Sequence, residues 1–199
     1  MQKTYFHDNK HISEKNINDV IGKIYSIFRE GKFLDLYDKL CVEIINKYYE
    51  GDAKYQAIPS ARIHIPKQQQ TVDFHCDQFY GHGPNIKNYW LPLTNVYDSN
   101  SMYVINRKRS QKLIEQTKKQ KESILSFNEK CLGESESLKM SFGEIFVFDS
   151  QTIHGTKLNR TSSTRVSFDF RIVIGDDDIG LKDHSFFISS RKSTNSVKK

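Results

Sequence analysis

The spacing of hydrophobic residues changes once along the chain, near residue 58. From Ile12 to about Tyr49, apolar residues recur every three or four positions, which predicts two amphipathic helices within residues 12–50, separated near Gly31. From Ile58 onward the period falls to two, in short runs rich in β-branched and aromatic residues, which predicts strands. The predicted strands cover residues 58–65, 71–79, 87–94, 101–105, 138–142, 144–149 and 164–174.

A charged segment at residues 107–130 interrupts this β pattern with helical spacing, and we expect a helical insertion packed outside the sheets. Its predicted apolar positions are Leu113, Ile114, Ile124 and Leu125. Residues 189–199 are rich in Ser and Lys and predict a disordered basic tail. The expected fold is therefore one mainly β domain over residues 1–188, a sandwich or jelly roll with its β core at 58–175 and with the N-terminal helices supporting the larger sheet.

Composition narrows the class of protein. The chain has 199 residues, with 30 Lys and Arg against 24 Asp and Glu, and four of the positive charges of its +6 excess lie in the predicted tail. This weak charge argues against a protein that coats nucleic acid, while it tolerates an anionic small molecule as a partner. The sequence predicts no membrane span or signal peptide, so we expect a soluble cytoplasmic protein. Cys41, Cys76 and Cys131 lack any pairing motif and are expected to be free thiols.

Polar residues share one face in four of the predicted strands. Alternation puts His75 and Asp77 on the same side of their strand, opposite apolar neighbours. The other residues that share such faces are Arg62, His64, Asn88, Trp90, Arg165, Ser167, Asp169 and Arg171. Solvent-facing strands are the ordinary explanation, but none of these four faces carries Lys or Glu. The alternative is a polar lumen between two sheets, which would hold a metal and a charged ligand.

His75, Asp77 and His154 are the candidate metal ligands, since His154 follows a predicted apolar strand. Two His and one carboxylate form the set that holds Fe(II) on one face and leaves open positions for substrate and dioxygen. Arg165 stands eleven residues after His154, and with Ser167 it offers a guanidinium fork and a hydroxyl to a carboxylate. A purely structural version of this arginine would instead be neutralised by Asp169.

This motif set resembles the phytanoyl-CoA-dioxygenase-type branch of the Fe(II)/2-oxoglutarate-dependent oxygenases, over about residues 58–174. The resemblance implies a double-stranded β-helix, the jelly roll that cupins share. It implies that the three candidate ligands bind iron, that Arg165 and Ser167 bind the distal carboxylate of 2-oxoglutarate, and that Trp90 lies beside this cosubstrate. The chain departs from the family pattern at residues 100–109, where Ser101 replaces a glycine and Asn-Arg-Lys-Arg replaces a PGSH sequence.

The resemblance implies hydroxylation or oxidation of a small molecule, with Fe(II), 2-oxoglutarate and O2 as cofactor and cosubstrates and with release of succinate and CO2. It extends to small oxygenases of carbohydrate and aminoglycoside biosynthesis clusters, which makes a sugar or nucleotide-linked sugar a candidate substrate. The candidate substrate contacts are Arg62, His64, Phe79, His82, Asn88 and Arg171. Structural hydrogen bonds, ordinary turn positions and an ion pair between Arg171 and Asp169 are the alternatives for them.

Two other functions stay open at this stage. Arg165 and Arg171 reproduce the R-x5-R of nucleic-acid demethylases resembling AlkB, although the gap from His154 to Arg165 is short for that group and the charge of the chain is low. A cupin-like module that binds or isomerises sugars without oxidation is the other alternative. The sequence carries no signal for an oligomeric state.

Overall fold

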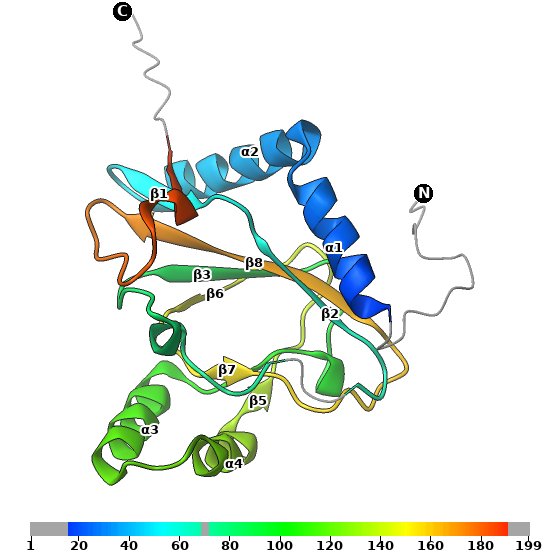
Figure 1. The fold of residues 1–199 in the computed structure, drawn as a ribbon, viewed down its shortest axis with the longest axis vertical. Helices are drawn as coiled ribbons and strands as arrows, with labels where there is room; N and C mark the ends of the chain where they lie inside the picture. The colour runs from blue at the N-terminus through cyan, green and yellow to red at the C-terminus, as the bar shows by residue number, and fades with distance from the viewer. Residues whose placement is uncertain (1–15, 69–71, 191–199) are drawn as a thin grey trace, which may run out of the picture.

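The computed structural model describes residues 16–68 and 72–190. Two N-terminal helices, α1 (Ile17–Phe28) and α2 (Gly31–Tyr48), lie on one side of the larger sheet (Figure 1). This agrees with the two helices and the break near Gly31 that the sequence predicts. The apolar stripes of the helices bury side chains against the sheet. The main buried residues of this core are Phe28, Tyr37, Cys41, Ile45, Tyr55, Tyr89, Phe168, Phe170 and Ile172.

The described strands form two antiparallel sheets. The larger sheet has the order β6-β3-β8-β1-β9, with β2 also paired to β8, and the smaller sheet has the order β5-β4-β7. Their bounds are β1 Ala53–Gln56, β2 Ser60–His64, β3 Lys87–Pro92, β4 Tyr103–Val104, β5 Glu136–Ser137, β6 Phe146–Asp149, β7 His154–Gly155, β8 Arg165–Ile174 and β9 Phe187–Ser189. The two sheets lie on opposite sides of the interior in Figure 1, which confirms the jelly-roll fold.

The long strand β8 organises the interior. Its apolar residues face the helices, and its polar residues face the smaller sheet. In the register with β3, Trp90 is opposite Asp169 and Asn88 is opposite Arg171, so these side chains share one face. In the register with β2, Arg62 is opposite Ser167. The shared polar face predicted from alternation is therefore present on β2, β3 and β8.

Several predicted strands are wrong. Residues 72–80 contain an isolated bridge at His75 and a 3-10 helix, η1 (Asp77–Tyr80), which ends at Gly81 in the left-handed region, because the chain must turn there. The segment 138–142 is not a strand, and Met140 forms an isolated bridge with Val96. The sequence prediction also missed β1, β5, β7 and β9, which are short. Two further 3-10 helices are η2 (Asp98–Asn100) and η3 (His184–Phe186).

The predicted tail begins too early. Ser189 belongs to β9, and the backbone N–H of Ser190 donates to the carbonyl of Ala53 at 2.9 Å, so the larger sheet keeps these residues ordered. Residues 191–199 of the predicted tail lie outside the described residues, as do residues 12–15 of the predicted helical region.

The insertion consists of α3 (Arg107–Gln120) and α4 (Ile124–Glu134), which lie beyond the smaller sheet (Figure 1). Leu113 and Ile114 are buried as expected, but the predicted apolar positions Ile124 and Leu125 are 78% and 70% exposed, because Lys121 breaks the helix in the left-handed region. The buried residues of α4 are instead Phe127 and Cys131, which pack with Phe74, Cys76, Ile105 and Ile153. Within the described ranges, no helix is long and apolar enough to cross a membrane.

Candidate active site

His75, Asp77 and His154 come together in the interior, at the edge of the smaller sheet. The backbones of the two histidines are joined by a pair of hydrogen bonds of 3.0 and 2.9 Å, which places their ring centroids 4.3 Å apart. The Nε2 atom of each ring lies 3.7 Å from Oδ1 of Asp77, which begins η1. The structure therefore gathers the three candidate ligands, although His75 lies in an isolated bridge and Asp77 in η1, and not in the predicted strand.

Backbone carbonyls fix which nitrogen of each imidazole carries the proton. Nδ1 of His75 lies 2.7 Å from the carbonyl oxygen of Asp73, and Nδ1 of His154 lies 3.0 Å from that of Thr152. A carbonyl only accepts, so each Nδ1 donates and each Nε2 keeps its lone pair toward Asp77. Burial, with the nearby His154, lowers the pKa of His75 to about 3, so this ring is neutral. Neutral imidazoles with oriented Nε2 atoms are the form that binds metal.

Asp77 supplies the negative charge of the cluster. It is buried, and its Oδ2 accepts a hydrogen bond of 2.8 Å from Nε of Arg171. Burial alone would raise the pKa of this carboxyl, but the charge of Arg171 outweighs burial and holds the pKa below its usual range. Two imidazoles and one carboxylate fit a divalent transition metal such as Fe(II).

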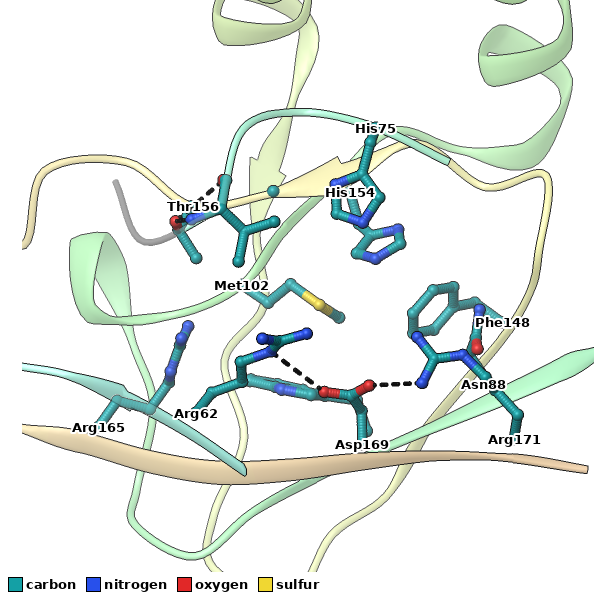
Figure 2. A pocket seen from close by; sticks show the side chains of 13 residues that line it. Arg62, His75, Asn88, Met102, Phe148, His154, Thr156, Arg165, Asp169 and Arg171 are labelled. Atoms are coloured by element: carbon teal, nitrogen blue, oxygen red, sulfur yellow. Dashed lines mark hydrogen bonds and ion pairs between the residues drawn. The ribbon is translucent and has the colours of Figure 1, made fainter. Parts of the chain in front are cut away.

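The cluster opens into a pocket between the two sheets (Figure 2). Figure 2 shows the imidazoles of His75 and His154 on one side and the pair of Asp169 and Arg171 on the other. Thirteen residues border it: Arg62, Val72, His75, Asn88, Trp90, Met102, Phe148, His154, Gly155, Thr156, Arg165, Asp169 and Arg171. The pocket thus has apolar walls and a few fixed polar groups, as sites for small molecules do.

Arg165 is a buried cation that forms no ion pair with the described residues. It is 2% exposed, and its Nε and Nη1 atoms have no hydrogen-bond partner within the described parts of the chain. Burial lowers its pKa to about 10, with Arg62 adding to the effect, so it stays protonated at neutral pH. A buried charge of this kind is costly unless a ligand anion pairs with it.

Asp169 does not neutralise Arg165. Its Oδ2 accepts from Nη1 of Arg171 at 2.9 Å, and its Oδ1 lies 3.5 Å from Nε of Arg62. The expected ion pair between Asp169 and Arg171 is therefore present, whereas Asp169 acts on Arg165 only through its nearby charge, which raises the pKa of Arg165. Ser167 is buried beside Arg165 on β8, and its Oγ has no partner among the described residues.

The six candidate substrate contacts separate into two groups. Arg62, Asn88 and Arg171 border the pocket, as the sequence predicts. His64, Phe79 and His82 do not border it.

Each of these three side chains is directed elsewhere by its surroundings. His64 is fully buried, with Nε2 at 3.4 Å from the carbonyl oxygen of Gln68. The turn of η1 directs Phe79 toward Phe127, with ring centroids 5.6 Å apart. The ring of His82 packs against Phe186 at 5.7 Å.

Sequence reasoning missed several residues that border the pocket. Thr156 stands two positions after His154, so alternation would have found it, whereas Met102 and Phe148 read as ordinary core residues. Gln56 accepts a hydrogen bond from Arg171 at 2.9 Å, but it lies on a strand that the sequence did not signal.

Comparison with known proteins gives a match to a family and to one fold. A family model described as phytanoyl-CoA dioxygenase (PhyH) matches residues 3–167. The streptomycin biosynthesis protein StrG of Streptomyces griseus is 31% identical over 124 residues, which are 61% of this chain and 48% of StrG. The chain thus spans about half the length of that curated relative.

Two solved structures of a non-heme monooxygenase, ThoJ, share the fold. The nickel complex of ThoJ superposes with a TM-score of 0.53 at 13% identity, over 76% of this chain and 56% of ThoJ. The apo form gives a TM-score of 0.53 at 11% identity, over 76% of this chain and 57% of ThoJ. At this identity the likeness concerns the fold.

Proposed function

Because this chain belongs to the phytanoyl-CoA dioxygenase family, we propose that it is an Fe(II)- and 2-oxoglutarate-dependent oxygenase that hydroxylates or oxidises a small molecule. One observation carries the proposal. A cluster of two histidines and one carboxylate opens into the same pocket as Arg165, a buried cation that has no ion-pair partner in the described parts of the chain. An organic acid that also binds a metal would pair with Arg165 and bind the metal that the three ligands would hold.

The three ligands would hold Fe(II) and leave open positions for ligands that come from outside the protein. Fe(II), when bound, supplies the activation of O2 that couples oxidation of a substrate to conversion of 2-oxoglutarate into succinate and CO2. The backbone carbonyls of Asp73 and Thr152 keep the Nε2 lone pairs of His75 and His154 directed at this position. The ligand geometry is thus prepared before a metal arrives.

Arg165 would bind the distal carboxylate of 2-oxoglutarate through its unpaired Nε and Nη1 atoms, and Ser167 would add its hydroxyl. Trp90 borders the pocket beside Arg165 and would lie against the cosubstrate. Met102 and Phe148 complete the apolar wall and would exclude water from the reacting groups.

Arg62 and Asn88 are the substrate contacts that we propose. The side chain of Arg62 is 42% exposed, so it lies toward the mouth of the pocket, whereas Asn88 is buried within it. Arg171 is less suited to an anionic substrate than the sequence suggested, because Asp77 and Asp169 already pair with it.

A sugar or nucleotide-linked sugar is the substrate class that we propose. An amide group forms hydrogen bonds with hydroxyls, and a guanidinium group binds phosphates. Asn88 offers the amide, and Arg62 offers the guanidinium. The similarity to StrG, a streptomycin biosynthesis protein by name, supports a biosynthetic small molecule. The comparisons support neither an AlkB-like demethylase nor a cupin-like module without oxidation.

We also propose that the protein acts in the cytoplasm. Cys41, Cys76 and Cys131 are buried free thiols, which is typical of a reducing compartment. Fractionation of cells that express a tagged chain would test this.

The oxygenase proposal is tested by adding Fe(II) and then 2-oxoglutarate to the purified chain without oxygen, and recording the visible charge-transfer band of an iron-bound keto acid. We expect a band in the wild type and none in His75→Ala or Arg165→Ala. No band in the folded wild type would contradict the proposal. A band that persists in Arg165→Ala would contradict only the role given to that arginine.

A further inference from the structure

Arg171 contacts one of the candidate metal ligands and two residues that are not ligands. Its Nε donates to Oδ2 of Asp77 at 2.8 Å. Its Nη1 donates to Oε1 of Gln56 and to Oδ2 of Asp169, both at 2.9 Å. These acceptors come from η1, β1 and β8, so three separate elements meet at one guanidinium group.

The two residues that are not ligands hold the guanidinium in place. Gln56 is buried, and its Nε2 donates to the carbonyl of Ile58 at 2.7 Å, so its amide is itself oriented. Asp169 is flanked by Arg62 on its other oxygen. Burial alone would lower the pKa of Arg171, but Asp169 and Asp77 outweigh burial and raise it, so the group stays a cation. A planar fork held by two fixed acceptors has little freedom to turn.

The two carboxylate oxygens of Asp77 have different neighbours. Oδ2 accepts from Arg171, while Oδ1 lies 3.7 Å from Nε2 of both His75 and His154. A carboxylate with both oxygens free is able to bind a metal through one oxygen or through two, or to turn away from it. With Oδ2 engaged, Oδ1 alone is directed at the position where the metal would lie.

We propose that Arg171 is a positioning residue, which holds Asp77 so that the carboxylate meets the metal through Oδ1 only. This keeps one more position open for ligands from outside the protein than binding through both oxygens would. The inference rests on the proposed function, since it takes the three ligands to be a metal site. The role depends on the contact of Arg171 with Asp77, and the ion pair with Asp169 alone would not explain it.

The test uses Co(II) alone as the probe, because its visible absorption reports the number and arrangement of its ligands. The full-length wild type is compared with Arg171→Met, which removes the charge and the fork, and with Arg171→Lys, which keeps the charge. Arg160→Met is the control, since Arg160 is an exposed arginine that does not border the pocket. Co(II) affinity is measured by calorimetry, and folding by circular dichroism and thermal unfolding.

We expect Arg171→Met to bind Co(II) about 10- to 100-fold more weakly than the wild type, as is typical when a partner of a metal ligand is lost. Its Co(II) spectrum should change, because Asp77 is then free to bind through both oxygens. Arg171→Lys should fall between these two proteins, and Arg160→Met should stay within about twofold of the wild type, since it leaves the partner of Asp77 in place.

Unchanged affinity and spectrum in a folded Arg171 variant would overturn the inference. If Arg171→Met does not fold, Arg171→Lys carries the same test, and wild-type binding by that variant would overturn the role of the fork. A wild type that binds no Co(II) would contradict the metal site itself and hence the proposed function. The two failures are therefore distinguishable.

Discussion

The guanidinium carbon of Arg165 lies 5.9 Å from the centroid of the Trp90 ring, across the boundary between β8 and β3. The register of the two strands explains this contact, since Trp90 is opposite Asp169 and both arginine and tryptophan are on the face toward the smaller sheet. An aromatic ring stabilises a cation but does not neutralise it. Arg165 therefore combines a fixed position with an unbalanced charge, which suits an anionic ligand.

Replacing Arg165 with methionine should weaken binding of 2-oxoglutarate without harming the fold. A charge-assisted contact with a carboxylate contributes about 1.5–3 kcal/mol, so we expect a loss of affinity of about 10- to 100-fold. Without ligand, the free energy of unfolding should be equal or higher, because a buried unpaired charge is removed. Calorimetry with Ni(II) present and urea unfolding measure the two effects.

Arg160→Met is the control for this variant, since Arg160 is an exposed arginine that does not border the pocket. Unchanged 2-oxoglutarate affinity in Arg165→Met would rule out Arg165 as the carboxylate site. A large loss of stability would mean that Arg165 has a partner within the fold.

Removing His154 should abolish stabilisation by a divalent metal. A ligand that binds only the folded state stabilises it by about 2.7 kcal/mol at one hundred times its dissociation constant. For a chain of this size that corresponds to a rise in Tm of about 5–10 °C. We expect this rise for the wild type with Ni(II), almost none for His154→Ala, and reversal by a chelator. An equal rise in both proteins would place the metal elsewhere.

Alternation along the strands predicted much of this site. Arg165, Ser167, Asp169 and Arg171 share one face of β8 because a strand has a strict period of two. Position in the sequence thus determines which side of the sheet each residue takes. The same rule placed Trp90 on this face, and its neighbours were confirmed by the strand register.

Other parts of the site depend on contacts between distant segments, which no local pattern carries. His75 and Asp77 converge through a turn, and the partner strand of His75 is the two-residue β7, too short to show a period. Gln56 reaches Arg171 only because β1 pairs with β8. The ion pair of Arg171 with Asp77 was for the same reason not predictable.

Gly83 should be intolerant of any side chain. A Cβ atom built there would lie 1.6 Å from the carbonyl oxygen of Asp178, so the backbone of the two loops must separate to admit it. We expect Gly83→Ala to lower the free energy of unfolding by about 1–3 kcal/mol, as overpacking does.

Gly22→Ala is the matched control for Gly83→Ala. Gly22 is an exposed residue of α1 with nothing within 4 Å of the added atom, so alanine should raise stability there by about 0.5–1 kcal/mol. Chemical denaturation of both variants checks the pair. Equal effects of the two substitutions would contradict the close approach of the loops.

The three thiols should be almost unreactive in the folded protein. Cys41, Cys76 and Cys131 are fully buried, and burial raises their pKa values to about 12, 11 and 12. At pH 8 we expect reaction with an aromatic disulfide reagent to be at least about 100-fold slower than in denaturant, because the thiolate is the reactive form. Rapid reaction of one thiol in the native state would show that its segment opens.

Replacing Asn88 distinguishes a role in binding substrate from a role in stabilising the fold. Both its Nδ2 and its Oδ1 are buried at the pocket without a hydrogen-bond partner within the described ranges. An unsatisfied buried amide costs about 1–3 kcal/mol, so Asn88→Leu should raise the free energy of unfolding by roughly this amount. Against a panel of sugars and nucleotide-linked sugars, the same variant should lose any substrate stimulation of succinate release that the wild type shows.

Asn85→Leu, at an exposed position, should change stability by less than about 0.5 kcal/mol. If Asn88→Leu is less stable than the wild type, the amide has a structural partner, and the substrate contact proposed for Asn88 loses its physical basis.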